Sequence, residues 1–133
     1  AIHFSLSHSD KMIALAFQKN HPLGVDIEKI QQADKYENVI QQYFTSDEQK
    51  QIAHSDNAAF FKIWTQKEAI GKVSGRGIAN LPENTIPENY EISTVPLDGY
   101  ILSTCFFRDN EIRFMTINVQ NVLDQINILS LRP

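Results

Sequence analysis

The chain has 133 residues, 42% of them hydrophobic, and a net charge of −4 at pH 7. This length supports one compact core and is too short for two ordinary domains, so we expect residues 1–133 to form a single domain. Only 12 residues are Lys or Arg, against 16 that are Asp or Glu. Proteins that bind duplex nucleic acid concentrate basic residues on one face, and the composition therefore argues against nucleic acid as a partner.

Two features of the composition bear on the cellular compartment. Cys105 is the single cysteine and lies in the apolar run "ILSTCFF", which is typical of a buried thiol in a reducing cytosol. No apolar run approaches the roughly 20 residues that span a bilayer, and no charged-then-apolar leader opens the chain. We therefore expect a cytoplasmic protein with no membrane partner. The first residue is Ala1 rather than Met, so the chain is either processed or a piece of a longer protein.

The N-terminal segment has the pattern of three short strands. Residues 2–7 and 12–17 are apolar or alternating runs, and residues 8–11 between them predict a hairpin turn. A third run, residues 23–30, follows the turn signal at residues 20–22. Three consecutive short strands predict an antiparallel three-stranded meander.

The next segment changes to a helical period. In residues 33–44 the apolar side chains recur at i, i+3, i+4, i+7 and i+8, which predicts an amphipathic helix. Thr45 and Glu48 match a capping box that would open a short second helix ending at about Ala53.

A longer helix and a second set of strands complete the pattern. We expect Asn57 to cap the helix and Gly75 to end it, before a loop rich in Gly, Pro and Asn at residues 76–89. Alternating and apolar runs then predict further strands at residues 90–95, 100–108 and 112–120. Strands, helices and strands in this order predict an α+β fold with a helical layer on an antiparallel sheet.

Two acidic residues alternate with apolar ones in the third predicted strand, "GVDIE". Successive strand side chains point to opposite faces, so Asp26 and Glu28 share one face while Val25 and Ile27 share the other. One interpretation is an edge strand with a solvated outer face, because charged residues are mostly exposed. The alternative is a metal site. Adjacent carboxylates raise each other's pKa unless a cation lies between them, and a hard divalent ion suits such a pair.

The long predicted helix places three different side chains in line within "WTQKEAIGK". Trp64, Glu68 and Lys72 recur every four residues and therefore stack on one side of the helix. One interpretation is an ordinary Glu-to-Lys helix pair, worth roughly 0.2 to 0.5 kcal/mol, with Trp64 in the core. The apolar anchor on the same side favours a functional interpretation, since solvated charge pairs usually avoid such a side.

These two segments together resemble a family signature. "GVDIE" followed by "WTQKEAIGK" is similar to the Gly-hydrophobic-Asp and Trp-x-x-Lys-Glu motifs of the 4'-phosphopantetheinyl transferases. "FSLSHS", "FTSDE" and "VSGRGIANLP" resemble segments of the surfactin-type members. The likeness covers about residues 3 to 82 by motif, and the strand pattern continues it to about residue 119. Thr65 departs from the pattern, because the family usually has Ser, Ala or Cys at that position.

The resemblance implies a reaction. These enzymes transfer the phosphopantetheinyl arm of coenzyme A to a serine of an acyl or peptidyl carrier protein, and adenosine 3',5'-bisphosphate leaves. Coenzyme A as co-substrate, Mg²⁺ as cofactor and a carrier protein as partner are therefore expected. Such chemistry needs a divalent ion for the phosphate oxygens, a base for the hydroxyl and a cation near the leaving phosphate.

The resemblance also assigns roles to individual residues. Asp26 and Glu68 match metal ligands, and Glu28 matches a position that binds the ion directly or through water. Glu68 is also the expected general base on the carrier serine. Lys72 would bind coenzyme A and stabilise or protonate the leaving bisphosphate. Lys67 is expected to face the phosphates of coenzyme A or the partner protein.

Three further residues match motif positions. Ser7 and His8 match contacts to the coenzyme A phosphates, and a histidine beside two hydroxyls in a turn can donate several hydrogen bonds to an anion. Glu48 matches an acidic position of the family, but its place in the capping box supports a purely structural role equally well.

The resemblance extends to only part of the family's longer enzymes. Surfactin-type members consist of two similar halves in one chain with the active site between them, and this chain matches the C-terminal half. We therefore expect either a piece of a pseudo-dimeric enzyme or a chain that self-associates to form the two-half arrangement. Two alternatives from other classes remain: a non-catalytic half-domain that binds carrier protein or coenzyme A, and a Mg²⁺-dependent nucleotide or pyrophosphate hydrolase.

Overall fold

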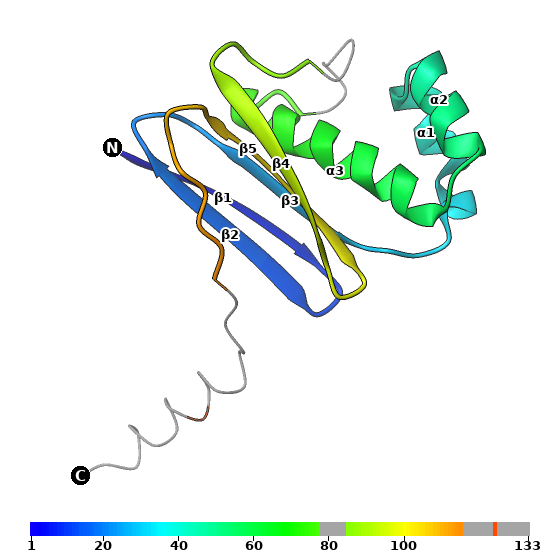
Figure 1. Cartoon of the computed structure of the whole chain (residues 1–133), viewed down its shortest axis with the longest axis horizontal. Coiled ribbons are helices and arrows are strands. Elements are labelled where there is room, and N and C mark those ends of the chain that lie inside the picture. Colours follow the sequence, from blue (N-terminus) through cyan, green and yellow to red (C-terminus); the bar gives the residue numbers. More distant parts are fainter. Residues whose placement is uncertain (78–84, 116–123, 125–133) are drawn as a thin grey trace.

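The computed structural model describes residues 1–77, 85–115 and 124, and these form an α+β fold (Figure 1). The elements, in chain order, are β1 Ile2–Ser9, β2 Met12–Lys19, β3 Gly24–Lys29, a 3₁₀ turn Ala33–Tyr36, α1 Glu37–Tyr43, α2 Ser46–Ala53, α3 Asn57–Ser74, β4 Tyr90–Leu97 and β5 Tyr100–Phe107. The expected α+β class is confirmed. Within the described ranges, no helix combines the length and the apolar character needed to cross a membrane.

Five strands lie in the described ranges, and they form two antiparallel sheets. β1 and β2 make a hairpin, and the second sheet has the strand order β3-β5-β4. β3 pairs with β5 from Gly24 opposite Cys105 to Lys29 opposite Tyr100. The pairing differs from the expected three-stranded meander, because the third strand joins β5 instead of β2.

Apolar packing explains why β3 leaves the hairpin. Val25 and Ile27 are buried together, as the alternation predicts, and they pack against the inner face of β2, which consists of Met12, Ala14 and Ala16. Packing one sheet on the other buries both sets of apolar side chains, whereas a continued ladder would leave them side by side on one surface. The hairpin therefore lies against β3 rather than extending its sheet.

The hairpin is longer than the sequence pattern predicts. Pairing continues to Ser9, so only Asp10 and Lys11 form the turn, and His8, expected in the turn, belongs to β1. Asp10 has a positive φ of 49°, which aspartate tolerates better than most residues. Its carboxylate accepts a hydrogen bond from Lys29 Nζ at 3.1 Å, which helps to hold the tip of the hairpin on β3.

The ends of α3 follow local rules with one change. Asp56, not the expected Asn57, is the N-cap, and its side chain accepts the Ala59 N–H at 3.3 Å. The Asn57 side chain instead accepts the N–H of Ala33 at 3.0 Å, which ties α3 to the 3₁₀ turn. Gly75 ends the helix with a φ of 70°, as predicted, because glycine adopts this left-handed conformation without steric cost.

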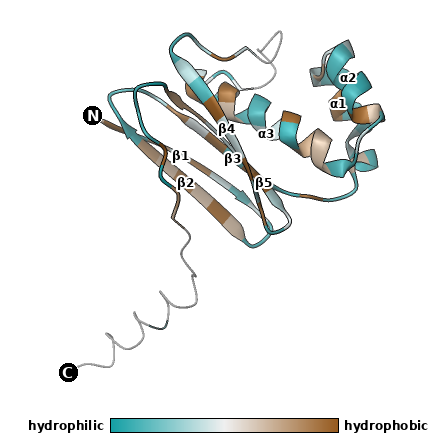
Figure 2. Ribbon diagram, viewed as in Figure 1, coloured by the Kyte–Doolittle hydropathy of each residue, from teal (hydrophilic) through white to brown (hydrophobic). Residues whose placement is uncertain are grey.

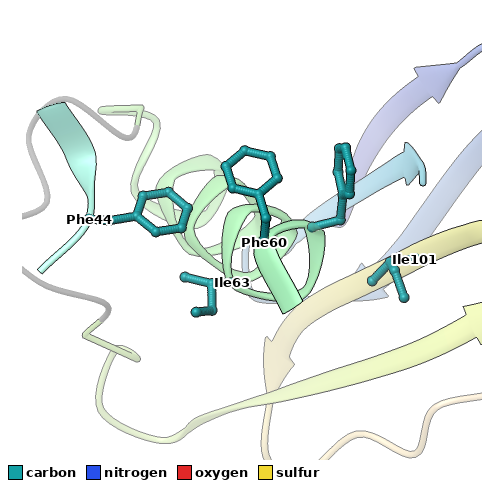
Figure 3. Close-up of a cluster of buried hydrophobic side chains, with 5 residues drawn as sticks. Phe44, Phe60, Ile63 and Ile101 are labelled. Carbon is teal, nitrogen blue, oxygen red and sulfur yellow. The ribbon is translucent and has the colours of Figure 1, made fainter. Parts of the chain in front are cut away.

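The helical layer packs on the sheet through aromatic side chains. Phe60 and Phe61 of α3 are fully buried, and Phe60 stacks on Phe44 with a centroid distance of 5.4 Å. Figure 3 shows this cluster, to which β5 contributes Ile101. Cys105, also from β5, lies in a neighbouring cluster, so the expected buried thiol is confirmed. Burial raises the pKa of this thiol to about 12, which leaves it protonated and unreactive.

β4 and β5 confirm two of the three strands expected after the helices. Pro96 falls in β4, which lies at an edge of its sheet, where a missing N–H is tolerated. Residues 111–115 have no regular structure. The third expected strand, residues 112–120, therefore does not begin where predicted, and its remainder lies outside the described residues.

Gly24 allows α3 to lie directly against β3. A Cβ atom at this position would be 1.9 Å from the carbonyl oxygen of Ala69 and 3.0 Å from Cβ of Lys72. The backbones of β3 and α3 therefore touch at a point just before Asp26. This contact sets the distance between the acidic strand and the helix that carries Lys72.

We predict that Gly24→Ala separates β3 from α3. No side chain fits 1.9 Å from a helix carbonyl, so overpacking should lower the free energy of unfolding, measured in urea, by about 3 kcal/mol or more. Gly75→Ala is the control, because its site has no neighbour within 4 Å and only the left-handed backbone is strained. Equal losses of stability in the two variants would contradict the close-contact role of Gly24.

Candidate functional site

The candidate site lies between β1, β3 and α3. β3 contributes Asp26 and Glu28, and α3 contributes Glu68 and, one turn later, Lys72. Asp26 is only 5% exposed, whereas the other three side chains are partly exposed. The close approach of the two backbones at Gly24 brings these residues together.

Asp26 is the centre of the site. Its Oδ1 accepts a hydrogen bond from Ser7 Oγ at 3.0 Å and lies 3.5 Å from Lys72 Nζ. Its Oδ2 is buried and has no hydrogen-bond donor among the described residues. A buried carboxylate oxygen without a donor is costly, and a cation or a donor brought by a ligand would satisfy it.

The carboxyl groups of Asp26, Glu28 and Glu68 all have raised pKa values. Burial, followed by the charge of Glu28, raises the pKa of Asp26 to about 7. Lys72 and Ser7 act on this pKa in the opposite direction. Burial and then Glu68 raise the pKa of Glu28, and burial raises that of Glu68. The site therefore resists full ionisation at neutral pH, which is the situation that a bound cation relieves.

Lys72 is held over the acidic strand by several contacts. Its Nζ donates to the carbonyl oxygen of Val25 at 2.7 Å and to that of Leu6 at 3.3 Å. These carbonyls belong to β3 and β1, so one ammonium group bridges two strands. Since Asp26 lies 3.5 Å away, Lys72 also supplies positive charge beside the buried carboxylate.

The donors of the site fit a hard divalent ion in their chemistry. Carboxylate oxygens are ligands that Mg²⁺ prefers in proteins, with water completing the octahedron, and Asp26 Oδ2 is a buried oxygen in need of a partner. In the part of the chain that the structure describes, however, no three His, Cys, Asp or Glu side chains are gathered closely enough to hold an ion. Asp26, Glu28 and Glu68 are electrostatic neighbours that would have to converge for the predicted coordination.

Ser7 and His8 lie on opposite faces of β1. Ser7 is buried, and its hydroxyl accepts the N–H of Ile27 at 3.1 Å while donating to Asp26. His8 is exposed, and it only weakly opposes the rise in the pKa of Glu28 that burial and Glu68 cause. The Ser7 hydroxyl is therefore engaged with the acidic strand, and the expected contacts of both residues with coenzyme A stay predictions.

Lys67 is buried inside the protein, whereas the sequence predicted that it faces the phosphates or the partner. Its side chain is 2% exposed, its Nζ lies 2.9 Å from Glu48 Oε1, and it lies 5.6 Å from the centre of the Phe44 ring. Helical geometry explains the difference, because one residue before Glu68 points to another side of α3, here the side covered by α2. The ammonium group is used inside the protein, in contrast to its expected position facing the phosphates or the partner.

Glu48 makes two structural contacts at once. Its Oε1 accepts the Thr45 N–H at 2.9 Å, and its own N–H donates to Thr45 Oγ1 at 3.2 Å, so the expected capping box is confirmed. The same Oε1 is the counter-ion of the buried Lys67. These contacts support the structural interpretation of Glu48.

The sequence interpretation does not anticipate Ser9. Its Oγ donates to Glu28 Oε2 at 3.5 Å and accepts the N–H of Lys29 at 3.0 Å. The available signal is the spacing of the serines in "SLSHS", which has the same period of two as the acids in "GVDIE". Thr65, the departure from the family pattern, is fully buried, and its hydroxyl bonds with Ser103 Oγ at 2.8 Å.

The chain matches a known protein family. A profile described as the 4'-phosphopantetheinyl transferase superfamily matches residues 22–117, which contain β3, α3, β4 and β5. The chain therefore belongs to the 4'-phosphopantetheinyl transferase superfamily, and the resemblance seen in its two motifs is confirmed.

Curated relatives carry the family name. The chain is 38% identical to the 4'-phosphopantetheinyl transferase gsp of Aneurinibacillus migulanus over 58% of its own length and 33% of the relative's. It is 32% identical to the 4'-phosphopantetheinyl transferase AcpT of Salmonella typhimurium over 77% and 56% of the two chains. It is 35% identical to the 4'-phosphopantetheinyl transferase psf-1 of Bacillus pumilus over 59% and 34%. The chain thus spans between a third and a little over half of the length of these relatives.

We predict that the metal-free chain loses stability as the pH rises from about 4 to about 7. The pKa of Asp26 is raised from 3.8 to about 7 in the folded chain, so the folded state holds this proton more tightly than the unfolded state. The corresponding stabilisation is complete below the unfolded pKa and is lost as the pH rises through the folded one. The loss should be on the order of a few kcal/mol and is measured by urea unfolding across this range.

Asp26→Asn is the matched variant for this prediction, because it keeps the shape of the side chain and removes the titration. Its free energy of unfolding should change less between acidic and neutral pH than that of the unaltered chain. Parallel pH profiles of the two proteins would show that Asp26 is not the source of the decline.

We predict that Lys67 and Glu48 contribute to stability rather than to binding of coenzyme A. Glu48→Ala leaves the Lys67 ammonium buried without its counter-ion and should lower the free energy of unfolding by about 3–5 kcal/mol. Lys67→Met keeps much of the volume and leaves Glu48 unpaired, but Glu48 is 13% exposed and still accepts the Thr45 N–H, so this variant should cost less. Urea denaturation measures both changes. Loss of coenzyme A affinity in a stable Lys67→Met variant would argue against the structural role.

Proposed function

We propose that the chain is the catalytic half of a 4'-phosphopantetheinyl transferase that moves the phosphopantetheine arm of coenzyme A to a serine of an acyl or peptidyl carrier protein. Its membership of the superfamily supports this activity. The observation that carries the proposal is the 3.5 Å contact of Asp26 with Lys72 where β3 and α3 touch, with Glu68 near enough to raise the pKa of Asp26. Asp26 Oδ2, buried without a donor among the described residues, an ammonium group and a neighbouring carboxylate are available in this region.

Glu68 is suited to act as the general base. Burial raises the pKa of its carboxyl, and a carboxylate with a raised pKa is a stronger proton acceptor. Glu68 would take the proton of the carrier serine while the serine oxygen bonds to the pantetheine-side phosphorus of the coenzyme A pyrophosphate. The bond between that phosphorus and the bridging oxygen breaks, and adenosine 3',5'-bisphosphate leaves with the electron pair.

Lys72 is suited to the leaving phosphate. Its side chain is partly exposed and is held beside Asp26 by two carbonyl contacts. A lysine ammonium group acts as a point charge toward phosphate oxygens. Lys72 would therefore bind coenzyme A and stabilise the charge that develops on the bisphosphate, or protonate it.

Asp26 and Glu68, with Glu28 directly or through water, would hold Mg²⁺. When bound, the ion would neutralise the pyrophosphate oxygens and polarise the phosphorus that is attacked. Asp26 must be ionised for this role. The Ser7 hydrogen bond and the charge of Lys72 both favour the ionised form and so support ion binding.

One face of the β1-β2 hairpin would pack against further protein. Its outward side chains are large and apolar, with exposed fractions between 51% and 71%. We call this face the hairpin patch, and it consists of Ile2, Phe4, Leu6, Ile13, Leu15 and Phe17. Phe4 lies opposite Phe17 and Leu6 opposite Leu15, so patch residues of β1 and β2 are neighbours across the hairpin. Figure 2 shows where hydrophobic residues fall along the ribbon of this hairpin. Exposed apolar patches of this kind mark interaction sites.

A second half of the same fold is the proposed occupant of the hairpin patch. The resemblance to surfactin-type enzymes implies two similar halves with the active site between them, and the part that this chain matches is 33% and 56% of the length of two relatives. The second half would belong either to the same polypeptide or to a second copy of this chain. In both cases the hairpin patch would be buried.

The proposed partners are coenzyme A and a carrier protein, and the proposed location is the cytoplasm. Coenzyme A would contact Lys72, Ser7 and His8, as the motif resemblance implies. The single cysteine, Cys105, is buried and unpaired, which supports a reducing compartment.

We predict that apo carrier protein incubated with this chain, coenzyme A and Mg²⁺ gains the mass of one phosphopantetheine arm, measured by intact-protein mass spectrometry. Glu68→Ala should slow the transfer by about 10²- to 10⁴-fold, because a positioned general base contributes that much. Glu91→Ala is the matched control, since Glu91 is an exposed acid on β4 that pairs with Arg108 at the opposite edge of the sheet from β3. It should transfer at the unaltered rate.

Several outcomes would count against the proposal. Full activity of Glu68→Ala would contradict the role of Glu68 as base. Binding of coenzyme A or carrier protein without transfer would favour a non-catalytic half-domain, and release of phosphate products without a carrier would favour a hydrolase. Light scattering on the same sample reports the assembly: transfer by a dimer would favour a second copy, rather than a further part of the same polypeptide, as the partner of the hairpin patch.

A further inference from the structure

β1 carries serines at alternate positions, all on its inner face. The hydroxyl oxygens of Ser5, Ser7 and Ser9 accept the N–H groups of Val25, Ile27 and Lys29 at 3.1, 3.1 and 3.0 Å. β3 is an edge strand whose other side pairs with β5. The serine side chains therefore replace the backbone ladder that this edge lacks, and Ser5 and Ser7 satisfy N–H groups that would otherwise be buried without acceptors.

Two of the three serines make a second bond. Ser7 donates to Asp26 Oδ1 at 3.0 Å, and Ser9 donates to Glu28 Oε2 at 3.5 Å. A serine hydroxyl has one donor and two acceptor sites, so it can accept a backbone N–H and donate to a carboxylate at the same time. Ser5 lies at the corresponding place opposite Gly24, which has no side chain to receive such a bond.

This arrangement decides which carboxylate oxygen remains available. Ser7 is fixed by the Ile27 N–H, so it holds Oδ1 of Asp26 and leaves the buried Oδ2 without a donor in the described part of the chain. A hydrogen bond to one oxygen of a ligating carboxylate orients the other oxygen toward the ion. Ser9 acts in the same way on Glu28 through a longer bond.

We propose that Ser7, assisted by Ser9, is a positioning residue that orients the carboxylates of Asp26 and Glu28 for a divalent ion. The inference rests on the proposed function, in which these carboxylates hold the ion. Its physical basis is that each hydroxyl makes two hydrogen bonds. It accepts a backbone N–H of β3 and donates to the carboxylate of the residue just before that N–H.

The test compares three single variants, Ser5→Ala, Ser7→Ala and Ser9→Ala. Each loses one hydroxyl-to-backbone bond, so urea unfolding should show a loss of stability in all three. Binding of Mn²⁺ alone, followed by electron paramagnetic resonance above the pH at which the acids ionise, should separate them. Ser7→Ala should weaken Mn²⁺ binding by about 10- to 100-fold, Ser9→Ala should weaken it less, and Ser5→Ala should leave it unchanged.

Ser7→Thr keeps the hydroxyl and should retain the Mn²⁺ affinity, which separates the hydrogen bond from side-chain volume. If Ser7→Ala does not fold, the comparison of Ser9→Ala with Ser5→Ala carries the test, because Ser9 is less buried than Ser7. Equal Mn²⁺ affinity in the unaltered chain and in the folded Ser7 and Ser9 alanine variants would overturn the inference and leave the proposed function standing. Absence of Mn²⁺ binding in the unaltered chain would overturn the inference together with the metal-ligand roles of Asp26 and Glu28, while the transfer assay tests the activity separately.

Discussion

The backbone contact between Gly24 and Ala69 is the constraint on which the rest of the site depends. A methyl group in place of the Gly24 hydrogen would lie 1.9 Å from the Ala69 carbonyl oxygen, so β3 and α3 can touch only because the side chain is missing. Asp26 lies just beyond this contact on the strand, and Glu68 precedes Ala69 on the helix. The same packing that brings these carboxylates together removes water from them, and this desolvation is the first cause of their raised pKa values.

The contacts of Asp26 compensate only in part for the loss of water from its carboxylate. Lys72 and Ser7 both act on Oδ1 and favour the ionised form, while Oδ2 is buried without a donor in the described residues. A carboxylate with no compensation would stay protonated in such a site, and one with full compensation would have no oxygen left for a ligand. Asp26 lies between these limits, which suits the proposed role, in which this carboxylate would ionise and then bind a cation.

The sequence predicted what local rules determine. The Thr45 capping box, the Gly75 helix end and the split of β3 into an apolar and an acidic face depend on neighbouring residues, and they appear as expected. Alternation does not identify the neighbour of a strand, so the pairing of β3 with β5, which follows it after all the helices, could not be foreseen. Helical periodicity likewise places Lys67 and Glu68 on different sides of α3. It does not predict that Glu48 lies beside Lys67 and pairs with it.

β1 connects the hairpin patch on the surface to the candidate site, because its two faces make different contacts. Its inner serines hold β3 and the acids, and its outer side chains form half of the hairpin patch. Leu6 joins the two directly: its side chain is 52% exposed in the patch, while its carbonyl oxygen accepts from Lys72 Nζ. A protein surface packed on the hairpin patch would fix the position of β1, and with it the Ser7 hydroxyl and the carbonyl that anchors Lys72. Packing on the hairpin patch would therefore order the site even if the partner contributed no atom that touches Asp26 or Lys72.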